Sequence, residues 1–109
     1  MSSLRLDLHN HTSFSADGLL PPDELLRKAK ARGIDCIAVT DHNTVEGALA
    51  AQRLSMSDAS LPRVIPGVEL ATRDGEVVGL YVEKDIPRGL PLQEAVDRIR
   101  SLGGVVYLP

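Results

Sequence analysis

Residues 34–43 of this chain read Ile-Asp-Cys-Ile-Ala-Val-Thr-Asp-His-Asn, an apolar run that ends directly in polar side chains. The run Ile34–Val39 is typical of a strand buried on both faces of a parallel sheet. Thr-Asp-His, with His42 as its last residue, follows at the carboxyl end of that strand. In parallel α/β folds, ligands and catalytic groups gather at the carboxyl ends of the strands. The segment therefore predicts a parallel strand that presents His42 at a functional edge.

The sequence on either side of this segment alternates between strand and helix patterns. Leu4–Leu8 alternates leucine with charged residues, which predicts a short strand. Pro22 suits the first turn of a helix, which we expect to run to about Arg32. The other expected elements are a helix from a capping pair at Asn43 and Glu46 to about Leu54, a strand over residues 64–70 interrupted at Pro66-Gly67, a strand over 77–82 after the Asp74-Gly75 turn, a helix over 92–102 and a strand over 105–108. This alternation predicts an α/β fold with a mainly parallel sheet.

The composition is that of one ordinary globular domain over residues 1–109. The chain is 43% hydrophobic and 25% charged with a net charge of −3, which weighs against an anionic membrane partner and a nucleic-acid surface. Cys36 is the single cysteine, which excludes an internal disulfide framework and fits a reducing cytosol. Because it lies in an apolar strand, we expect a buried structural thiol. No apolar stretch reaches the length of a membrane span, so a cytoplasmic domain without a membrane partner is expected.

All three histidines lie within four residues of an aspartate near the end of an expected strand. His9 and His11 are two residues apart, so at the end of a strand their side chains point to one face. His42 follows the apolar strand, Glu69 ends the next one, and Asp17 lies in the loop after His11. Each feature alone has an ordinary explanation, such as a capping histidine or a solvated carboxylate. Together they predict one cluster at one edge of the sheet, formed by His9, His11, Asp17, His42 and Glu69.

The expected cluster combines neutral nitrogen donors with anionic oxygen donors. That mixture suits Zn²⁺, Mn²⁺ or Fe²⁺ better than Mg²⁺, which prefers oxygen ligands and retained water. A carboxylate such as Glu69 can bridge two ions, and ions about 3.5–4 Å apart stabilise both the attacking and the leaving oxygen in phosphoryl transfer. Asp7 lies two residues before His9 and Asp41 lies directly before His42, and we expect them to orient imidazoles. Ser13 and Ser15 have no free histidine base beside them and are interpreted as loop residues.

Four motifs of this chain resemble a known family. The Asp-x-His-x-His-Thr start, the Ser-x-Asp-Gly that follows it, Thr-Asp-His and Gly-x-Glu are similar to the motifs of PHP domains, the "polymerase and histidinol phosphatase" family of metal-dependent phosphoesterases. The resemblance implies a distorted TIM-like (β/α)7 barrel with two or three metal ions at the strand carboxyl ends. It also implies roles for individual residues. His9, His11 and Glu69 look like catalytic ligands of one ion, with Glu69 bridging to a second, and Asp17 and His42 look like ligands of a third.

The chain departs from the family pattern after His42. Members of the family supply further histidines and an Asp-x-His pair from later strands, and this sequence has no histidine beyond His42. We therefore expect the N-terminal half of a barrel from a longer protein. A half barrel leaves a strand edge unpaired, which favours self-association through that edge.

Three functions follow as hypotheses from these observations. The leading one is a metal-dependent phosphoesterase that hydrolyses a small phosphorylated substrate by attack of metal-bound hydroxide on phosphorus. The second is a catalytically incomplete metal-binding or interaction module. The third is an exonuclease of the PHP type that acts on nucleic-acid ends, against which the acidic balance of the chain weighs mildly.

Overall fold

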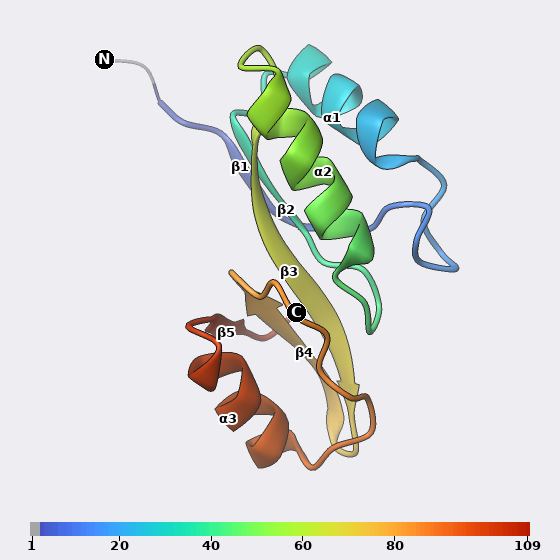
Figure 1. The fold of residues 1–109 in the computed structure, drawn as a ribbon, viewed down its shortest axis with the longest axis vertical. Helices are drawn as coiled ribbons and strands as arrows, with labels where there is room; N and C mark the ends of the chain where they lie inside the picture. The colour runs from blue at the N-terminus through green and yellow to red at the C-terminus, as the bar shows by residue number, and fades with distance from the viewer. Residues whose placement is uncertain (1–2) are drawn as a thin grey trace.

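A computed structural model describes residues 3–109 as one five-stranded sheet with three helices (Figure 1). The spatial order of the strands, β1-β2-β3-β4-β5, is their order in the chain. The elements are β1 (Leu6–Asn10), α1 (Pro22–Ala31), β2 (Cys36–Val39), α2 (Glu46–Ser57), β3 (Arg63–Thr72), β4 (Gly75–Leu80), α3 (Leu92–Ser101) and β5 (Val105–Tyr107). Each element expected from the sequence is present, with its ends shifted by a few residues.

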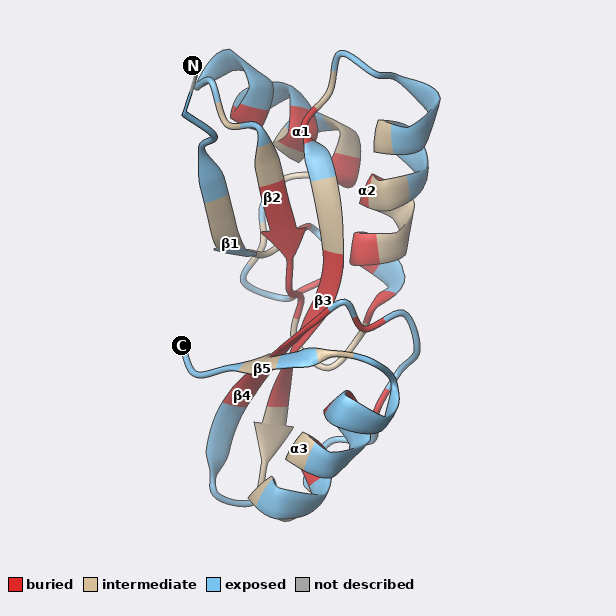
Figure 2. Cartoon of the chain, turned by 90° about the vertical axis from the view of Figure 1, so that its left-hand side faces the viewer, coloured by how far each residue is buried: buried red, intermediate tan, exposed pale blue. Residues whose placement is uncertain are grey.

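The first half of the chain forms a parallel layer covered by two helices. β1 pairs with β2, and β2 pairs with the first part of β3, both in parallel. α1 and α2 lie together on one side of these strands (Figure 1). The apolar side chains buried between the helices and the strands are Leu26, Ala29, Ile37, Val39, Ala48 and Ala51. Figure 2 shows that buried residues gather on β2, on the middle of β3 and on the second part of β4. This packing brings the carboxyl ends of β1 and β2 beside the middle of β3.

β3 runs through Pro66-Gly67 without the expected interruption. The strand changes partners at this point, because its first residues pair with β2 and those from Gly67 onward pair with β4. Pro66 has no N–H to donate, but its carbonyl oxygen accepts a hydrogen bond from the backbone N–H of Val82 at 3.1 Å. A Cβ at Gly67 would lie 2.5 Å from the carbonyl oxygen of Gly79, so glycine permits the close approach of β4. Proline and glycine here mark a change of partner within one strand.

The second half of the chain is an antiparallel layer with α3 packed against it. β3 and β4 form a hairpin in which Thr72 pairs with Gly75, so the expected turn is confirmed. β5 pairs with β4, again antiparallel. Ala95 and Ile99 of α3 are fully buried in a cluster with residues of β3 and β4.

The sheet is therefore parallel across β1–β3 and antiparallel across β3–β5, which corrects the expectation of a mainly parallel sheet. The hairpin expected at Asp74-Gly75 joins β3 to β4, and a hairpin can only join antiparallel strands, so the second half of the sheet is antiparallel.

β1 and β5 are the outermost strands of the sheet that residues 3–109 form, each with one hydrogen-bonded neighbour. Leu6 in β1 is 59% exposed, and Val105 in β5 is 54% exposed. Exposed apolar side chains on unpaired strands are the features that favour association between edges. The self-association expected from the sequence therefore stays a prediction, with two candidate edges. Within the same residues, no helix is both long and apolar enough to cross a membrane.

Candidate metal centre

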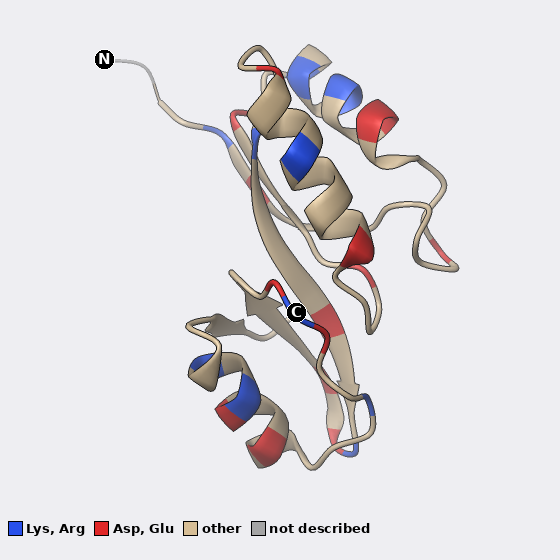
Figure 3. Cartoon of the chain, viewed as in Figure 1, with Lys and Arg blue, Asp and Glu red and all other residues tan. Residues whose placement is uncertain are grey.

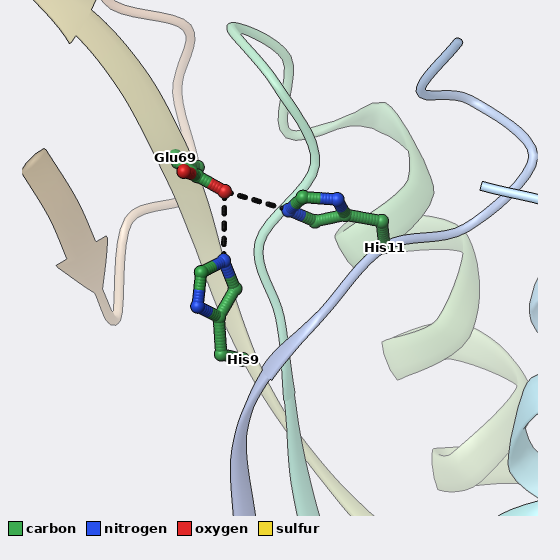
Figure 4. Close-up of side chains that lie close together, drawn as sticks. All are labelled: His9, His11 and Glu69. Atoms are coloured by element: carbon green, nitrogen blue, oxygen red, sulfur yellow. Dashed lines mark hydrogen bonds and ion pairs between the residues drawn. The ribbon is translucent and has the colours of Figure 1, made fainter. Parts of the chain in front are cut away.

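The carboxylate of Glu69 contacts two imidazoles, that of His9 in β1 and that of His11 directly after β1. Nε2 of His9 and Nε2 of His11 are each 2.7 Å from Glu69 Oε1 (Figure 4). The two rings share one face because His9 and His11 are two residues apart at the end of β1, as the sequence predicts. Glu69 is 6% exposed, so its charge is largely removed from water. This group, called the inner group below, consists of His9, His11 and Glu69.

Glu69 lies inside β3 and not at its end, which corrects its expected place. The strand continues for three more residues to Thr72, because the hairpin with β4 extends it. What ends near Glu69 is the parallel pairing with β2. The carboxylate nevertheless reaches the carboxyl end of β1, so Glu69 lies beside His9 and His11 as expected.

His42 reaches the same place from the turn between β2 and α2. It forms an isolated parallel β-bridge with Glu69, and its Nδ1 is 4.0 Å from Glu69 Oε1. The next residue, Asn43, has a φ of 57°, and its Oδ1 accepts a hydrogen bond from the backbone N–H of Ala71 at 2.9 Å. Asn43 therefore connects the turn to β3 by a hydrogen bond. The expectation that Asn43 caps α2 was wrong. Val45 occupies the position before the helix.

Asp17 stands opposite His11 and His42 on the loop that follows β1. Nδ1 of His11 is 3.1 Å from both carboxylate oxygens of Asp17, and Nε2 of His42 is 2.9 Å from Asp17 Oδ2. The rings of His11 and His42 are 4.4 Å apart between centroids. We call Asp17 and His42 the outer pair. The structure thus brings together all five residues that the sequence singled out.

Glu76 on β4 is a further member of the site that the sequence reasoning missed. Its Oε2 is 3.4 Å from Nδ1 of His42, and its carboxyl group hydrogen-bonds that of Glu69. The hairpin explains the contact, because Glu76 pairs with Ala71 and so shares a face with Glu69 two residues away. Counting back across the Asp74-Gly75 turn could have found it.

Crowding of these groups shifts their pKa values. Burial acts to raise the pKa of Glu69, but hydrogen bonds with Glu76, His9 and His11 outweigh it and the pKa is lowered. The hydrogen bond to Glu69 raises the pKa of Glu76. For His42, burial acts to lower the pKa, but the hydrogen bond to Asp17 and the nearby carboxylates raise it above its usual value. The site therefore gathers negative charge and stabilises positive charge placed within it.

The donor set fits a divalent transition metal. Three groups have one ligand atom from each residue, all within 4.8 Å of one another: His9–His11–Glu69, His11–Asp17–His42 and His42–Glu69–Glu76. Imidazole nitrogen combined with carboxylate oxygen is the ligand mixture that zinc, manganese and iron accept. The groups overlap through shared side chains, which is an arrangement suited to neighbouring ions.

Asp7 and Asp41 do not contact imidazoles, which corrects their expected role. Asp7 Oδ1 accepts a hydrogen bond from the backbone N–H of His9 at 3.3 Å. Asp41 is fully buried and binds Thr12 and Ser15 of the loop after β1. Ser15 is a loop residue, as interpreted from the sequence, and its hydroxyl is part of this buried network.

Residues 7–95 match the family model of the PHP domain. An uncharacterized protein from Methanocaldococcus jannaschii is 34% identical, and the match covers 97% of this chain and 67% of that protein. A 5'-3' exoribonuclease from Haemophilus influenzae is 33% identical, with 89% of this chain and 36% of the enzyme covered. This chain thus spans about two thirds of one relative and little more than a third of the other.

Solved structures agree with this family match in fold. A two-domain protein from Bacteroides vulgatus containing a predicted PHP-like metal-dependent phosphoesterase superposes with a TM-score of 0.78 at 20% identity, over 94% of this chain and 34% of that one. An amidohydrolase from Chromobacterium violaceum has a TM-score of 0.63 at 28% identity, over 89% of this chain and 32% of that one. The expected α/β half of a TIM-like barrel is therefore confirmed.

Proposed function

This chain belongs to the PHP-domain family, and from that premise we propose that it is a metal-dependent phosphoesterase that hydrolyses a phosphate ester. One observation carries the proposal: Glu69 Oε1 lies 2.7 Å from Nε2 of both His9 and His11. Donors from β1, from the residue that follows it and from β3 meet there, although 58 residues separate His11 from Glu69. Such convergence supports a built metal site more than a chance surface contact.

The proposed ligands divide into the inner group and the outer pair. His9, His11 and Glu69 would hold one ion, and Glu69 together with Glu76 would face a second. Asp17 and His42 would hold a third. We propose Zn²⁺, Mn²⁺ or Fe²⁺ for these positions, because the donor set is rich in nitrogen. The inner-group residues are also the proposed catalytic residues.

Ions of this kind, when bound, acidify a coordinated water and neutralise charge on phosphate oxygens. The side chains of the chain supply the orientation. Asp17 can accept the Nδ1–H of His11, which leaves the Nε2 lone pair of that ring directed toward Glu69. Burial of Glu69 keeps its charge from being screened by solvent, so it attracts a cation strongly.

A small phosphorylated molecule is the proposed substrate class. Half of the lysine and arginine residues lie on the three helices (Figure 3). The arginine ion pairs within residues 3–109 join Arg27 to Asp23 and Arg98 to Glu94, inside α1 and α3. The centre itself is acidic, so binding of a phosphate there depends on bound cations. This dependence predicts that substrate binding is lost when metal is removed.

Hydrolysis of p-nitrophenyl phosphate with and without Mn²⁺ tests the proposal. We expect turnover that requires Mn²⁺ and that His9→Gln lowers by at least about 100-fold, because a ligand is removed. Glu83→Gln is the matched control, since Glu83 is an exposed carboxylate outside the centre. Mn²⁺ binding without turnover on any phosphate ester would support the metal-binding module instead.

A second candidate is an exonuclease that cleaves phosphodiesters at nucleic-acid ends. The observation that favours it is the similarity to the 5'-3' exoribonuclease of Haemophilus influenzae. The same assay with a 5'-phosphorylated oligoribonucleotide separates the two candidates. Release of single nucleotides faster than hydrolysis of small esters would favour the exonuclease.

A further inference from the structure

Asp41 is a fully buried carboxylate that three groups of one loop surround with hydrogen bonds. The backbone N–H of Thr12 donates to Asp41 Oδ1 at 2.6 Å, and the Thr12 hydroxyl donates to Oδ2 at 2.6 Å. The Ser15 hydroxyl donates to Oδ1 at 2.7 Å. Burial of a charge is costly unless it is fully hydrogen-bonded, and here the loop provides the donors. The loop conformation and the burial of Asp41 therefore depend on each other.

Ser15 extends this network to the turn that carries His42. Its hydroxyl oxygen accepts a hydrogen bond from the backbone N–H of His42 at 2.9 Å while its O–H donates to Asp41. One hydroxyl thus connects the loop with the backbone of a proposed ligand. Two residues further along the same loop is Asp17, the partner of His42 in the outer pair. The network therefore connects the loop that carries Asp17 with the turn that carries His42.

Two glycines show how tightly the network is packed. A Cβ at Gly47, in the first turn of α2, would collide with Asp41 Oδ2 and Thr12 Oγ1. A Cβ at Gly18 would collide with the backbone carbonyl of Thr12. The loop is therefore packed between the first turn of α2 and the backbone near Gly18. This packing leaves little freedom for Ser15 to move.

We propose that Asp41, Thr12 and Ser15 are positioning residues that hold Asp17 against His42 and so set the metal affinity of the outer pair. The inference rests on the proposed function, since it assigns a task to residues behind the same centre. None of the three side chains is proposed to touch metal or substrate. His9 lies within β1 and Glu69 within β3, so the sheet places these two members of the inner group and the network acts mainly on the outer pair.

Titration calorimetry with Mn²⁺ on Ser15→Ala tests this, with Ser13→Ala as control because Ser13 is an exposed serine of the same loop. We expect Ser15→Ala to weaken the outer position by about tenfold, the range typical of residues that orient ligands. The Mn²⁺ affinity of the inner position in Ser15→Ala, and both affinities in Ser13→Ala, should change less than about twofold. In an Asp17→Asn background, Ser15→Ala should have no further effect, since the outer pair is already broken. An equal loss at both positions, or a further loss in that background, would overturn the inference.

Amide hydrogen exchange on the metal-free protein gives a second and independent readout. The His42 amide should exchange faster in Ser15→Ala than in wild type or Ser13→Ala, because it has lost its acceptor. If the wild type binds no Mn²⁺, the proposed function fails while this exchange rate still decides the positioning role. Unchanged exchange at His42 in Ser15→Ala would contradict it. Asp41→Asn serves as the second variant, and it retains the side-chain shape.

Discussion

His42 and Glu69 are joined backbone to backbone as an isolated parallel β-bridge, although β2 ends three residues before His42. The amide of Glu69 donates to the carbonyl oxygen of Asp41 at 2.9 Å, and the amide of Asn43 donates to the carbonyl oxygen of Glu69 at 3.0 Å. The bridge fixes two proposed metal ligands by backbone contacts, independently of their side chains. Backbone hydrogen bonds therefore set the placement of His42 relative to Glu69.

The left-handed backbone of Asn43 predicts a specific order of stabilities. Both Asn43→Ala and Asn43→Gly lose the hydrogen bond from Ala71, but only alanine places a Cβ in the left-handed region at a φ of 57°. We expect Asn43→Ala to lower the free energy of unfolding by about 1 kcal/mol more than Asn43→Gly. Urea denaturation followed by circular dichroism measures both. Equal stability of the two variants would show that the turn is not held in this conformation.

The raised pKa values of His42 and Glu76 predict that metal affinity decreases as the pH is lowered. The hydrogen bond to Glu69 keeps Glu76 protonated, and Asp17 with the other carboxylates keeps His42 protonated, to higher pH than usual. An ion must displace these protons, so Zn²⁺ affinity should fall as pH is lowered through the pKa of His42, which lies above about 6.5. Calorimetric titrations at several pH values measure the slope.

Glu76→Gln should make this pH dependence shallower, because it removes one titrating group and one charge that raises the pKa of His42. Glu83→Gln, with an exposed carboxylate elsewhere, should keep the wild-type slope. An unchanged slope in Glu76→Gln would mean that Glu76 takes no part in the centre.

Cys36 in β2 predicts a slowly reacting thiol. The side chain is half-buried, and burial raises the pKa of the thiol, an effect that the charge of Arg63 partly offsets. The reactive thiolate is therefore scarcer than in a free cysteine at the same pH. We expect alkylation by iodoacetamide at pH 8 to be several-fold slower in the native protein than in urea. Arg63→Gln should slow it further, and equal native and unfolded rates would contradict the burial.

The outer edge of β1 predicts concentration-dependent self-association. Leu6 is 59% exposed on a strand with one hydrogen-bonded neighbour in the described sheet. Leu6→Lys should weaken association, because lysine on an edge strand opposes pairing with another edge. Leu19→Lys is the matched control, since Leu19 is 90% exposed but lies in a loop. Sedimentation equilibrium that finds only monomer at every concentration would rule out this use of the edge.

The sequence predicts the part of the centre that depends on strand periodicity. His9 and His11 share a face because alternate residues of any strand do so, and both rings indeed reach one oxygen of Glu69. The apolar run before His42 likewise fixes its place at the end of β2. The positions of these three histidines can be predicted from strand periodicity and from the rule that parallel strands end at one edge of the sheet.

Contacts that depend on register or on side-chain direction were not predictable in this way. Glu76 enters the site only because β4 returns beside β3 in a particular register. Asp41 is adjacent to His42 in sequence, yet its carboxylate points into the loop after β1 and not toward an imidazole. The partner change of β3 at Pro66-Gly67 was not predicted, because locally the pair is typical of a strand break and the sequence does not show that one strand pairs with β2 and then with β4.

The metal content of the purified chain decides whether the inner group holds an ion. Elemental analysis after reconstitution and dialysis should find at least one Zn, Mn or Fe ion per chain in the wild type and in Glu83→Gln. Glu69→Gln should lose it, because Glu69 is the carboxylate that the inner group shares. A wild-type chain without metal, or a Glu69→Gln variant that retains the wild-type amount, would mean that His9, His11 and Glu69 do not form a metal site.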